Sequence, residues 1–416
     1  MMLDGTGRVA LITGAGRGIG RAIAEALHAR GIEAEVVEAA PEIRPLGVGI
    51  NLLPHATREL AALGVLEALE AVSIPTQEAS YFNRFGQLIL TEPLGRNAGY
   101  PTPQLSIHRG DLQMALLAAV RARLGADAVR TGLRCVGVDI EAGTARLVRS
   151  VGGEAAADLR ADAIVAADGI HSAVRRQLFP GEGPPIYSGV NMWRGTTRMA
   201  PILSGATMVR AGWLTQGKMV IYPIRRHPDG TVLMNWVAEI ETPRHHPNDW
   251  ARQGDLADFL PAFAEWQFDW CDVPAMIEAA DQVLEYPMVD KDPLPRWSFG
   301  RVTLLGDAAH PMYPPGSNGA GQAILDARCL ADRLAECGGD VVSALSAYDT
   351  ERREKTARVV RANRTQPPDA IIREVWERSG DRPFARIEDV IPRAELEAIL
   401  AAYKEVAGYD RASLAA

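Results

Sequence analysis

This 416-residue chain is organised around one late stretch, Arg301-Val-Thr-Leu-Leu-Gly-Asp-Ala-Ala-His-Pro-Met-Tyr-Pro-Pro-Gly-Ser-Asn-Gly-Ala-Gly-Gln-Ala-Ile-Leu-Asp326. Its apolar run from Val302 to Leu305 predicts a buried strand, and a helix is expected from about Gly319. The loop between them presents backbone N–H groups before a helix N-terminus, where negative charge is favoured. The candidates for a cofactor site here are Gly306, Asp307, Pro314, Gly316, Asn318 and Gly319.

A second signal lies near the start of the chain. The apolar run from Val9 to Ile12 precedes the turn Thr13-Gly-Ala-Gly-Arg-Gly-Ile-Gly20, and Glu38 follows a second apolar run. This order is typical of a βαβ nucleotide-binding unit, in which glycines let a pyrophosphate approach the backbone and an acid binds a ribose. We expect these roles for Gly14, Gly16, Gly18 and Glu38.

The same turn leaves an alternative open. Its spacing also fits the Thr-Gly-x-x-x-Gly-x-Gly turn of short-chain dehydrogenases. Those enzymes need a Tyr-x-x-x-Lys pair for proton transfer, and the sequence contains none; Tyr286 is followed by Lys291, one place too late. A nicotinamide-dependent dehydrogenase therefore remains the second interpretation, beside a non-catalytic flavin- or pigment-binding protein.

Further candidates lie between these two signals. Arg44, in the loop 41–51, is either a phosphate contact or a surface charge. Arg109 and Gln113 are four residues apart in a helix expected to run to Arg123, so they share one face. Asp168-Gly169 ends another apolar run, where a parallel strand delivers groups to a ligand crevice.

Residues 190–240 have the alternating pattern of an antiparallel sheet, which we expect to line an aromatic pocket. Its candidate substrate contacts are Tyr222 and Trp236, together with Tyr313 of the late loop. Helices are expected over 56–71, 250–280, 344–363 and 393–406.

The composition narrows the class of protein. The formal net charge of −8 argues against nucleic-acid binding, which favours a basic face. No apolar run of membrane-spanning length and no signal-peptide pattern is present, so a cytoplasmic protein without a membrane partner is expected. Four scattered cysteines form no Cys-x-x-Cys pair, and no metal site is predicted.

Taken together, these motifs resemble those of the group A flavoprotein monooxygenases, the p-hydroxybenzoate hydroxylase type. Within that family the likeness is greatest to the phenazine-modifying members that act on 5-methylphenazine-1-carboxylate. The segments that carry it include Glu42-Ile-Arg-Pro-Leu-Gly-Val-Gly-Ile-Asn51, Ser106-Ile-His-Arg-Gly-Asp-Leu-Gln-Met114, Ala167-Asp-Gly-Ile-His-Ser-Ala-Val-Arg175, Met192-Trp-Arg-Gly195 and Leu304-Leu-Gly-Asp-Ala-Ala-His-Pro-Met-Tyr-Pro314.

The resemblance implies FAD as cofactor, NADH or NADPH as reductant and O2 as co-substrate. FAD would form a hydroperoxide at the flavin C4a position, and an electron-rich aromatic ring would be hydroxylated, with or without decarboxylation. The protein would supply no nucleophile of its own. By match to the family motifs, Arg109 and the loop 316–319 would lie at the flavin, Asp307 at the ribitol and pyrophosphate, and Asp168-Gly169 at both FAD and the nicotinamide cofactor.

The resemblance also implies the architecture. We expect a Rossmann-like FAD-binding domain of mixed α/β structure, an antiparallel β-sheet substrate domain and C-terminal helices. The predicted boundaries are 1–74, 104–180 and 295–345 for the FAD-binding domain, 75–103 and 181–294 for the substrate domain, and 346–416 for the helices. The expected partner is a small aromatic molecule, bound by a monomer or homodimer.

Overall fold

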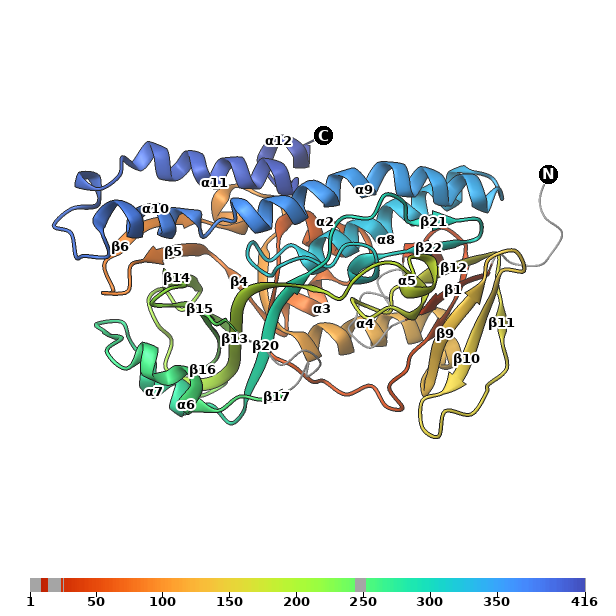
Figure 1. Ribbon diagram of the computed structural model, residues 1–416, viewed down its shortest axis with the longest axis horizontal. Coiled ribbons are helices and arrows are strands. Elements are labelled where there is room, and N and C mark those ends of the chain that lie inside the picture. The colour runs from red at the N-terminus through yellow and green to blue at the C-terminus, as the bar shows by residue number, and fades with distance from the viewer. Residues whose placement is uncertain (1–8, 14–23, 25, 244–251, 416) are drawn as a thin grey trace.

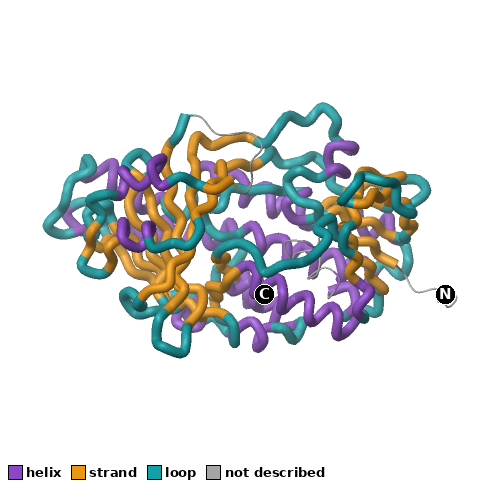
Figure 2. Tube along the Cα trace, turned by 90° about the horizontal axis from the view of Figure 1, so that it is seen from below, coloured by secondary structure: helices purple, strands orange, loops and turns teal. Residues whose placement is uncertain are grey.

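The computed structural model of this chain describes residues 9–13, 24, 26–243 and 252–415. The predicted pyrophosphate contacts Gly14, Gly16 and Gly18 lie outside the described residues. Two large sheets dominate the molecule, and Figure 2 shows strands gathered toward its two ends with helices and loops between them.

The first large sheet has six strands in the order β21-β22-β12-β1-β2-β8. All its pairings are parallel except that of the edge strand β21. Short apolar strands of this kind are buried on both faces. The bounds are β1 Val9–Thr13, β2 Glu33–Val37, β8 Val129–Arg130, β12 Ala163–Ala166, β21 Ser298–Phe299 and β22 Val302–Leu304.

The second large sheet has eight strands in the order β17-β20-β13-β16-β15-β14-β5-β6, antiparallel except between β14 and β5. The bounds are β5 Glu78–Phe82, β6 Leu88–Pro93, β13 Ile186–Met199, β14 Thr207–Trp213, β15 Gly217–Arg226, β16 Val232–Glu241, β17 Arg252–Gln253 and β20 Val283–Asp290.

Three small sheets complete the strand content of the described residues. The meander β9-β10-β11 packs into the core of the six-stranded sheet. The bounds are β3 Gly49–Leu52, β4 Ser73–Thr76, β7 Gln104–His108, β9 Leu133–Asp139, β10 Thr144–Arg149, β11 Leu159–Arg160, β18 Gln267–Phe268 and β19 Cys271–Asp272.

The C-terminal helices run along one long edge of the molecule (Figure 1). There α9 packs on α8 and β21, and α10 packs on β14, so together they span both large sheets. The helix bounds are α2 Pro54–Ala62, α3 Leu66–Glu70, α4 Arg109–Leu124, α5 Ala173–Leu178, α6 Leu256–Phe259, α7 Val273–Glu278, α8 Gly319–Glu336, α9 Val341–Thr365, α10 Ala370–Ser379, α11 Arg393–Ala407 and α12 Arg411–Ala415.

Most predicted elements are present, with two corrections. The helix expected over 56–71 is broken into α2 and α3, because Gly64 adopts a left-handed φ of 68° between them. The helix expected over 250–280 is wrong for the described part, 252–280, which forms short strands and the short helices α6 and α7. Within the described residues, no helix combines the length and apolar character needed to cross a membrane.

Candidate active site

A pocket of about 290 Å³, here the sheet-edge pocket, lies at the carboxyl ends of four parallel strands. In register, Thr13 of β1 lies beside Val37 of β2 and Ala166 of β12, and Ala166 lies beside Leu304 of β22. The residues that follow these strands therefore meet at one edge. They include Glu38, Asp168, Gly169, Gly306 and Asp307, all of which line the pocket.

The sheet-edge pocket contains buried oxygen atoms that lack partners in the described part of the chain. They are Oγ1 of Thr13, Oε2 of Glu38 and Oδ1 of Asp168. The second carboxylate oxygen of Glu38 accepts the Ala40 N–H at 2.7 Å, and that of Asp168 accepts the Ala173 N–H at 3.0 Å. Buried acceptors are normally satisfied, so this set fits a ligand that donates hydroxyl hydrogens. The ribose of FAD is such a ligand.

Electrostatics at Asp168 agree with this reading. Burial raises the pKa of its carboxyl above the ordinary value, although hydrogen bonds from Ser172 and from backbone N–H groups oppose the shift. A donor from a ligand would stabilise the ionised form further. Gly169 has a φ of 81° and Gly306 a φ of 60°, so both turns use the left-handed conformation that glycine adopts without strain.

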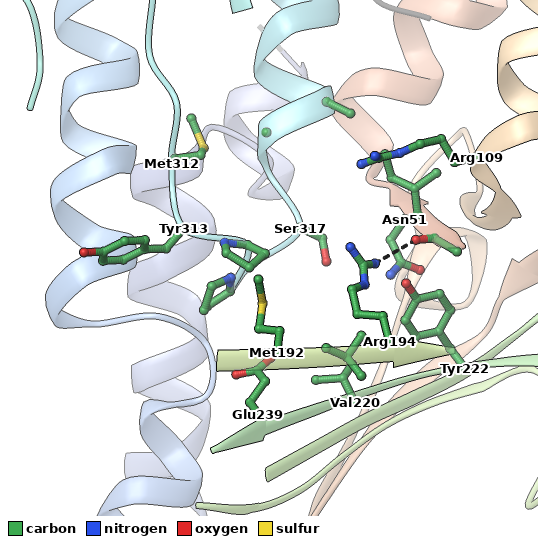
Figure 3. Close-up of a pocket in the computed structure, with 18 of the residues that line it drawn as sticks. Asn51, Arg109, Met192, Arg194, Val220, Tyr222, Glu239, Met312, Tyr313 and Ser317 are labelled. Atoms are coloured by element: carbon green, nitrogen blue, oxygen red, sulfur yellow. Dashed lines mark hydrogen bonds between the residues drawn. The ribbon is translucent and has the colours of Figure 1, made fainter. Parts of the chain in front are cut away.

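A second cavity of about 230 Å³, here the central pocket, lies between α4, the eight-stranded sheet and the loop 307–320. Asp307 lines both pockets and connects them. In Figure 3, Met192, Arg194, Val220 and Tyr222 rise from the strands toward the loop of Ser317, and Arg109 enters from α4. Most of the remaining lining is apolar, including Ile50, Leu112, Leu116, Val237, Met312, Pro314 and Pro315.

Two arginines of the central pocket retain unused hydrogen-bond donors. Arg194 donates from Nη2 to the Gly49 carbonyl at 3.0 Å, and Arg210 pairs through Nη1 with Asp369. The Nε–H groups of both arginines are buried and find no partner among the described residues. Burial raises the pKa of the nearby Tyr222 phenol, although Arg194 acts in the opposite direction. Most of the pocket lining is therefore apolar, and its charged groups include these two guanidinium groups and the carboxylates of Glu239, Asp307 and Asp369.

Arg210 also belongs to a buried group of four charges, here the charge tetrad: Arg210, Lys218, Glu239 and Asp369. Lys218 contacts Glu239 at 2.8 Å and also pairs with Asp369. Each member is less than a tenth exposed, and the two cations balance the two anions. Pairing of this kind is required because isolated buried charges cost several kcal/mol each.

The N-terminus of α8 borders the central pocket through Gly319 and Ala320, and its first turn holds no acidic residue. The preceding turn, Gly306–Ala308, is tied to α8 by the buried Asp326, which accepts from the Gly306 N–H and binds His310 at 2.5 Å and Arg352 at 2.7 Å. Burial would raise the pKa of Asp326, but these two partners lower it on balance.

The structure brings most described site candidates together. The sheet-edge pocket holds Glu38, Asp168, Gly169, Gly306 and Asp307, and the central pocket holds Arg109, Asp307, Pro314, Gly316, Gly319, Tyr222 and Tyr313. Four candidates line neither pocket. Arg44 is exposed and pairs with Glu42, Gln113 is buried in α4, and Asn318 is buried with its amide donating to Gly316 O and the Tyr403 hydroxyl.

The fourth, Trp236, is a correction. It is fully buried on the other face of β16, stacked near Phe259 and donating its Nε1–H to Thr197. Side chains alternate along a strand, so Val237 and Glu239 face the central pocket and Trp236 cannot.

Four charged residues of the central pocket are not among the candidates expected from the sequence: Arg194, Arg210, Glu239 and Asp369. A signal existed for Arg194, because Met192 and Arg194 share one face of the expected strand. No local signal pointed to Arg210 and Asp369, whose partnership spans 159 positions of the chain.

Comparison with known proteins identifies the family. A family model described as an FAD binding domain matches residues 8–363. The phenazine 1,6-dicarboxylic acid hydroxylase PhzS of Lysobacter antibioticus is 45% identical over 409 residues, which cover 95% of this chain and 96% of that protein. The 3-amino-4-hydroxybenzoate 2-monooxygenase PtmB3 of Streptomyces platensis is 33% identical over 364 residues, covering 86% and 87%.

Solved structures confirm the expected fold. HpxO of Klebsiella pneumoniae, complexed with FAD and uric acid, aligns with a TM-score of 0.77 and 23% identity over 97% of this chain and 98% of that one. A salicylate hydroxylase aligns with a TM-score of 0.73 and 23% identity over 97% and 96%. The family match together with the hydroxylase and monooxygenase relatives decides against the dehydrogenase and the non-catalytic alternatives. This chain therefore belongs to the FAD-binding family and is a group A FAD-dependent aromatic monooxygenase.

Proposed function

We propose that this enzyme hydroxylates a polycyclic aromatic carboxylate of the phenazine type, with FAD lying across both pockets. FAD joins a nucleotide to a flavin through a pyrophosphate, so two cavities connected at Asp307 suit its length and chemistry. Glu38 and Asp168 bind the ribose side, and Asp307 binds the ribitol and pyrophosphate region. Arg109 and the start of α8 face the flavin ring. The unsatisfied oxygens of Thr13, Glu38 and Asp168 support this placement.

When bound, FAD supplies the oxygen-transfer chemistry, with NADH or NADPH as reductant and O2 as co-substrate. The protein supplies the surroundings. The apolar lining of the central pocket excludes water from the reacting ring. The N-terminus of α8 stabilises negative charge on the reduced cofactor, because its first N–H groups have no partners within the helix.

The observation that carries the substrate class is the pair of unused guanidinium donors in a cavity whose lining is mostly apolar. The Nε–H groups of Arg194 and Arg210 need an acceptor. A carboxylate supplies one with opposite charge, and arginine matches its planar geometry. Met192, Val220 and Val237 of the strands suit the apolar face of a fused aromatic ring.

The phenazine class is supported by the relative that is 45% identical and is named for hydroxylating phenazine 1,6-dicarboxylic acid. A 5-methylphenazine-1-carboxylate is the more specific candidate, on the likeness of the motifs at 42–51, 106–114 and 192–195. Plain hydroxylation must be distinguished from hydroxylation with loss of the carboxyl group, since both reactions start from the same bound acid.

A substrate panel checks the proposal. Phenazine-1-carboxylate, phenazine-1,6-dicarboxylate, 5-methylphenazine-1-carboxylate, unsubstituted phenazine and salicylate are each incubated with the FAD-loaded enzyme. We expect a phenazine carboxylate to stimulate NAD(P)H oxidation, with a product heavier by about 16 mass units, or lighter by about 28 if carbon dioxide is lost. Unsubstituted phenazine turned over as efficiently as its carboxylates would refute the carboxylate-binding role, and inactivity of every tricyclic acid would refute the substrate class.

A further inference from the structure

The C-terminal segment 364–415 lies outside the part of the chain matched by the family model, which ends at residue 363. It nevertheless reaches the active site at two places. Asp369 lines the central pocket, and Tyr403 of α11 contacts the loop that borders the same pocket. Figure 1 shows α10 and α11 along the same edge as α9.

Three buried polar side chains hold this loop, and we call them the loop clamp: Asn318, Asn363 and Tyr403. The amide of Asn363 donates to the Tyr313 carbonyl at 2.9 Å, at the start of the loop. The hydroxyl of Tyr403 donates to Asn363 Oδ1 at 2.6 Å and accepts from Asn318 Nδ2 at 2.9 Å. Tyr403 thus joins the residue that holds one end of the loop to a residue at the other end.

The phenol of Tyr403 remains protonated at any ordinary pH. Burial raises its pKa well above that of a free tyrosine, although the hydrogen bond from Asn318 acts in the opposite direction. Tyr403 and Asn363 are each 3% exposed, and Asn318 is fully buried. Such a fully satisfied buried network fixes one arrangement of the groups it joins.

The loop backbone at Gly316 packs closely against the Tyr403 phenol. A Cβ added to Gly316 would lie 1.8 Å from the Tyr403 hydroxyl oxygen, and Gly316 has a φ of 87°. Its neighbour Ser317 has a φ of 57°, which is costly for a residue other than glycine. Gly316 and Ser317 both line the central pocket. The strained part of the loop is therefore the part that faces the ligand, and the clamp is what holds it there.

We propose that Tyr403 is a positioning residue for FAD: through Asn318 and Asn363 it holds the loop 313–319 and the start of α8 against the flavin ring. This inference rests on the proposed placement of FAD. The C-terminal segment, which lies beyond the matched FAD-binding region, would then contribute a residue that positions the cofactor. Loss of the hydroxyl would leave Asn363 Oδ1 buried without a donor and free the two ends of the loop from each other.

The test compares Tyr403→Phe with Tyr409→Phe in the full-length enzyme. Tyr409 is a matched control, because it belongs to the same segment and its ring packs on His55 and Tyr403. For Tyr403→Phe we expect FAD to bind about tenfold more weakly, the scale of one buried acceptor left unsatisfied. We also expect an altered visible flavin spectrum and a larger share of NAD(P)H consumption ending as H2O2, while Tyr409→Phe resembles the wild type.

A purely structural role predicts a different pattern. Tyr403→Phe would then lower the melting temperatures of the apo- and holoenzyme equally and leave FAD affinity, spectrum and H2O2 release unchanged, and that result would overturn the proposal. Asn318→Ala provides a second variant. If the clamp acts as a unit, the effects of Asn318→Ala and Tyr403→Phe on FAD affinity are not additive in the double variant. FAD affinity is measured without substrate, so an error in the proposed substrate leaves this test intact.

Discussion

At the scale of single residues, Asp307 has the most informative position in the site. Its half-buried carboxylate lines both pockets and forms no hydrogen bond or ion pair within the described part of the chain. Because this carboxylate, directly after the left-handed Gly306, has no partner among the described residues, it is available to bind a ligand. Glu38 and Asp168 differ, because each already accepts one backbone N–H.

We therefore expect Asp307→Ala to bind FAD more weakly, with little loss of folding stability. Hydrogen bonds to a charged group contribute about 1.5–3 kcal/mol, so FAD affinity should fall by roughly ten- to a hundredfold. Equilibrium titration of the apoenzyme with FAD, followed by flavin fluorescence, measures this change. Asp269→Ala, at an exposed position away from both pockets, is the control. Unchanged FAD affinity in Asp307→Ala would remove the assigned role of this carboxylate.

At the scale of elements, the loop between β22 and α8 combines backbone strain with a side-chain contact, and glycine scanning separates the two. Gly316 needs a left-handed φ and has Tyr403 in contact. Gly338, after α8, needs a left-handed φ of 58° but has no atom within 4 Å of its added Cβ. The two positions share the backbone requirement and differ in the contact.

Gly338→Ala should therefore cost about 1 kcal/mol, the usual penalty for a left-handed alanine. Gly316→Ala should cost more, about 1–3 kcal/mol beyond that, because the loop and Tyr403 must separate. Urea unfolding of both variants gives the difference, and FAD titration should show weaker binding only for Gly316→Ala. Equal costs at the two positions would mean that the loop yields without strain.

At the scale of the whole molecule, the charge tetrad connects the C-terminal helices to the eight-stranded sheet. Asp369 precedes α10, whereas Arg210 lies on β14 and Lys218 on β15. Burial would raise the pKa of Asp369, but the attraction of Arg210 and Lys218 lowers it to about 2. Its pKa is thus below the unfolded value of about 3.9. The stability it contributes is present above pH 4 and is lost as the pH falls toward 2.

Asp369→Asn should destabilise the protein at pH 7 by about 3–5 kcal/mol, because one carboxylate then faces two buried cations. The difference from the wild type should shrink as the pH is lowered from 4 to 2, where the wild type also becomes protonated. Urea unfolding across this range measures it. Asp229→Asn is the control, since the pKa of Asp229 is also lowered to about 2, but by hydrogen bonds from Thr231 and an exposed pair with Arg198. A constant difference at all pH values would contradict the ionic role.

The sequence by itself determined the strand at 302–304, the helix from Gly319 and the carboxylates at the strand ends, because apolar runs, glycines and helix starts specify backbone geometry locally. Only the tertiary structure decided which face of β16 meets the pocket, so the expected substrate contact Trp236 was wrong and Val237 lines the pocket instead. The tertiary structure also decided two pairings: Arg210 with Asp369, 159 positions apart, and Asn318 with Tyr403, 85 positions apart. Buried charges and hydrogen-bonding groups are stabilised by partners that tertiary packing brings together, and the local sequence pattern does not identify those partners.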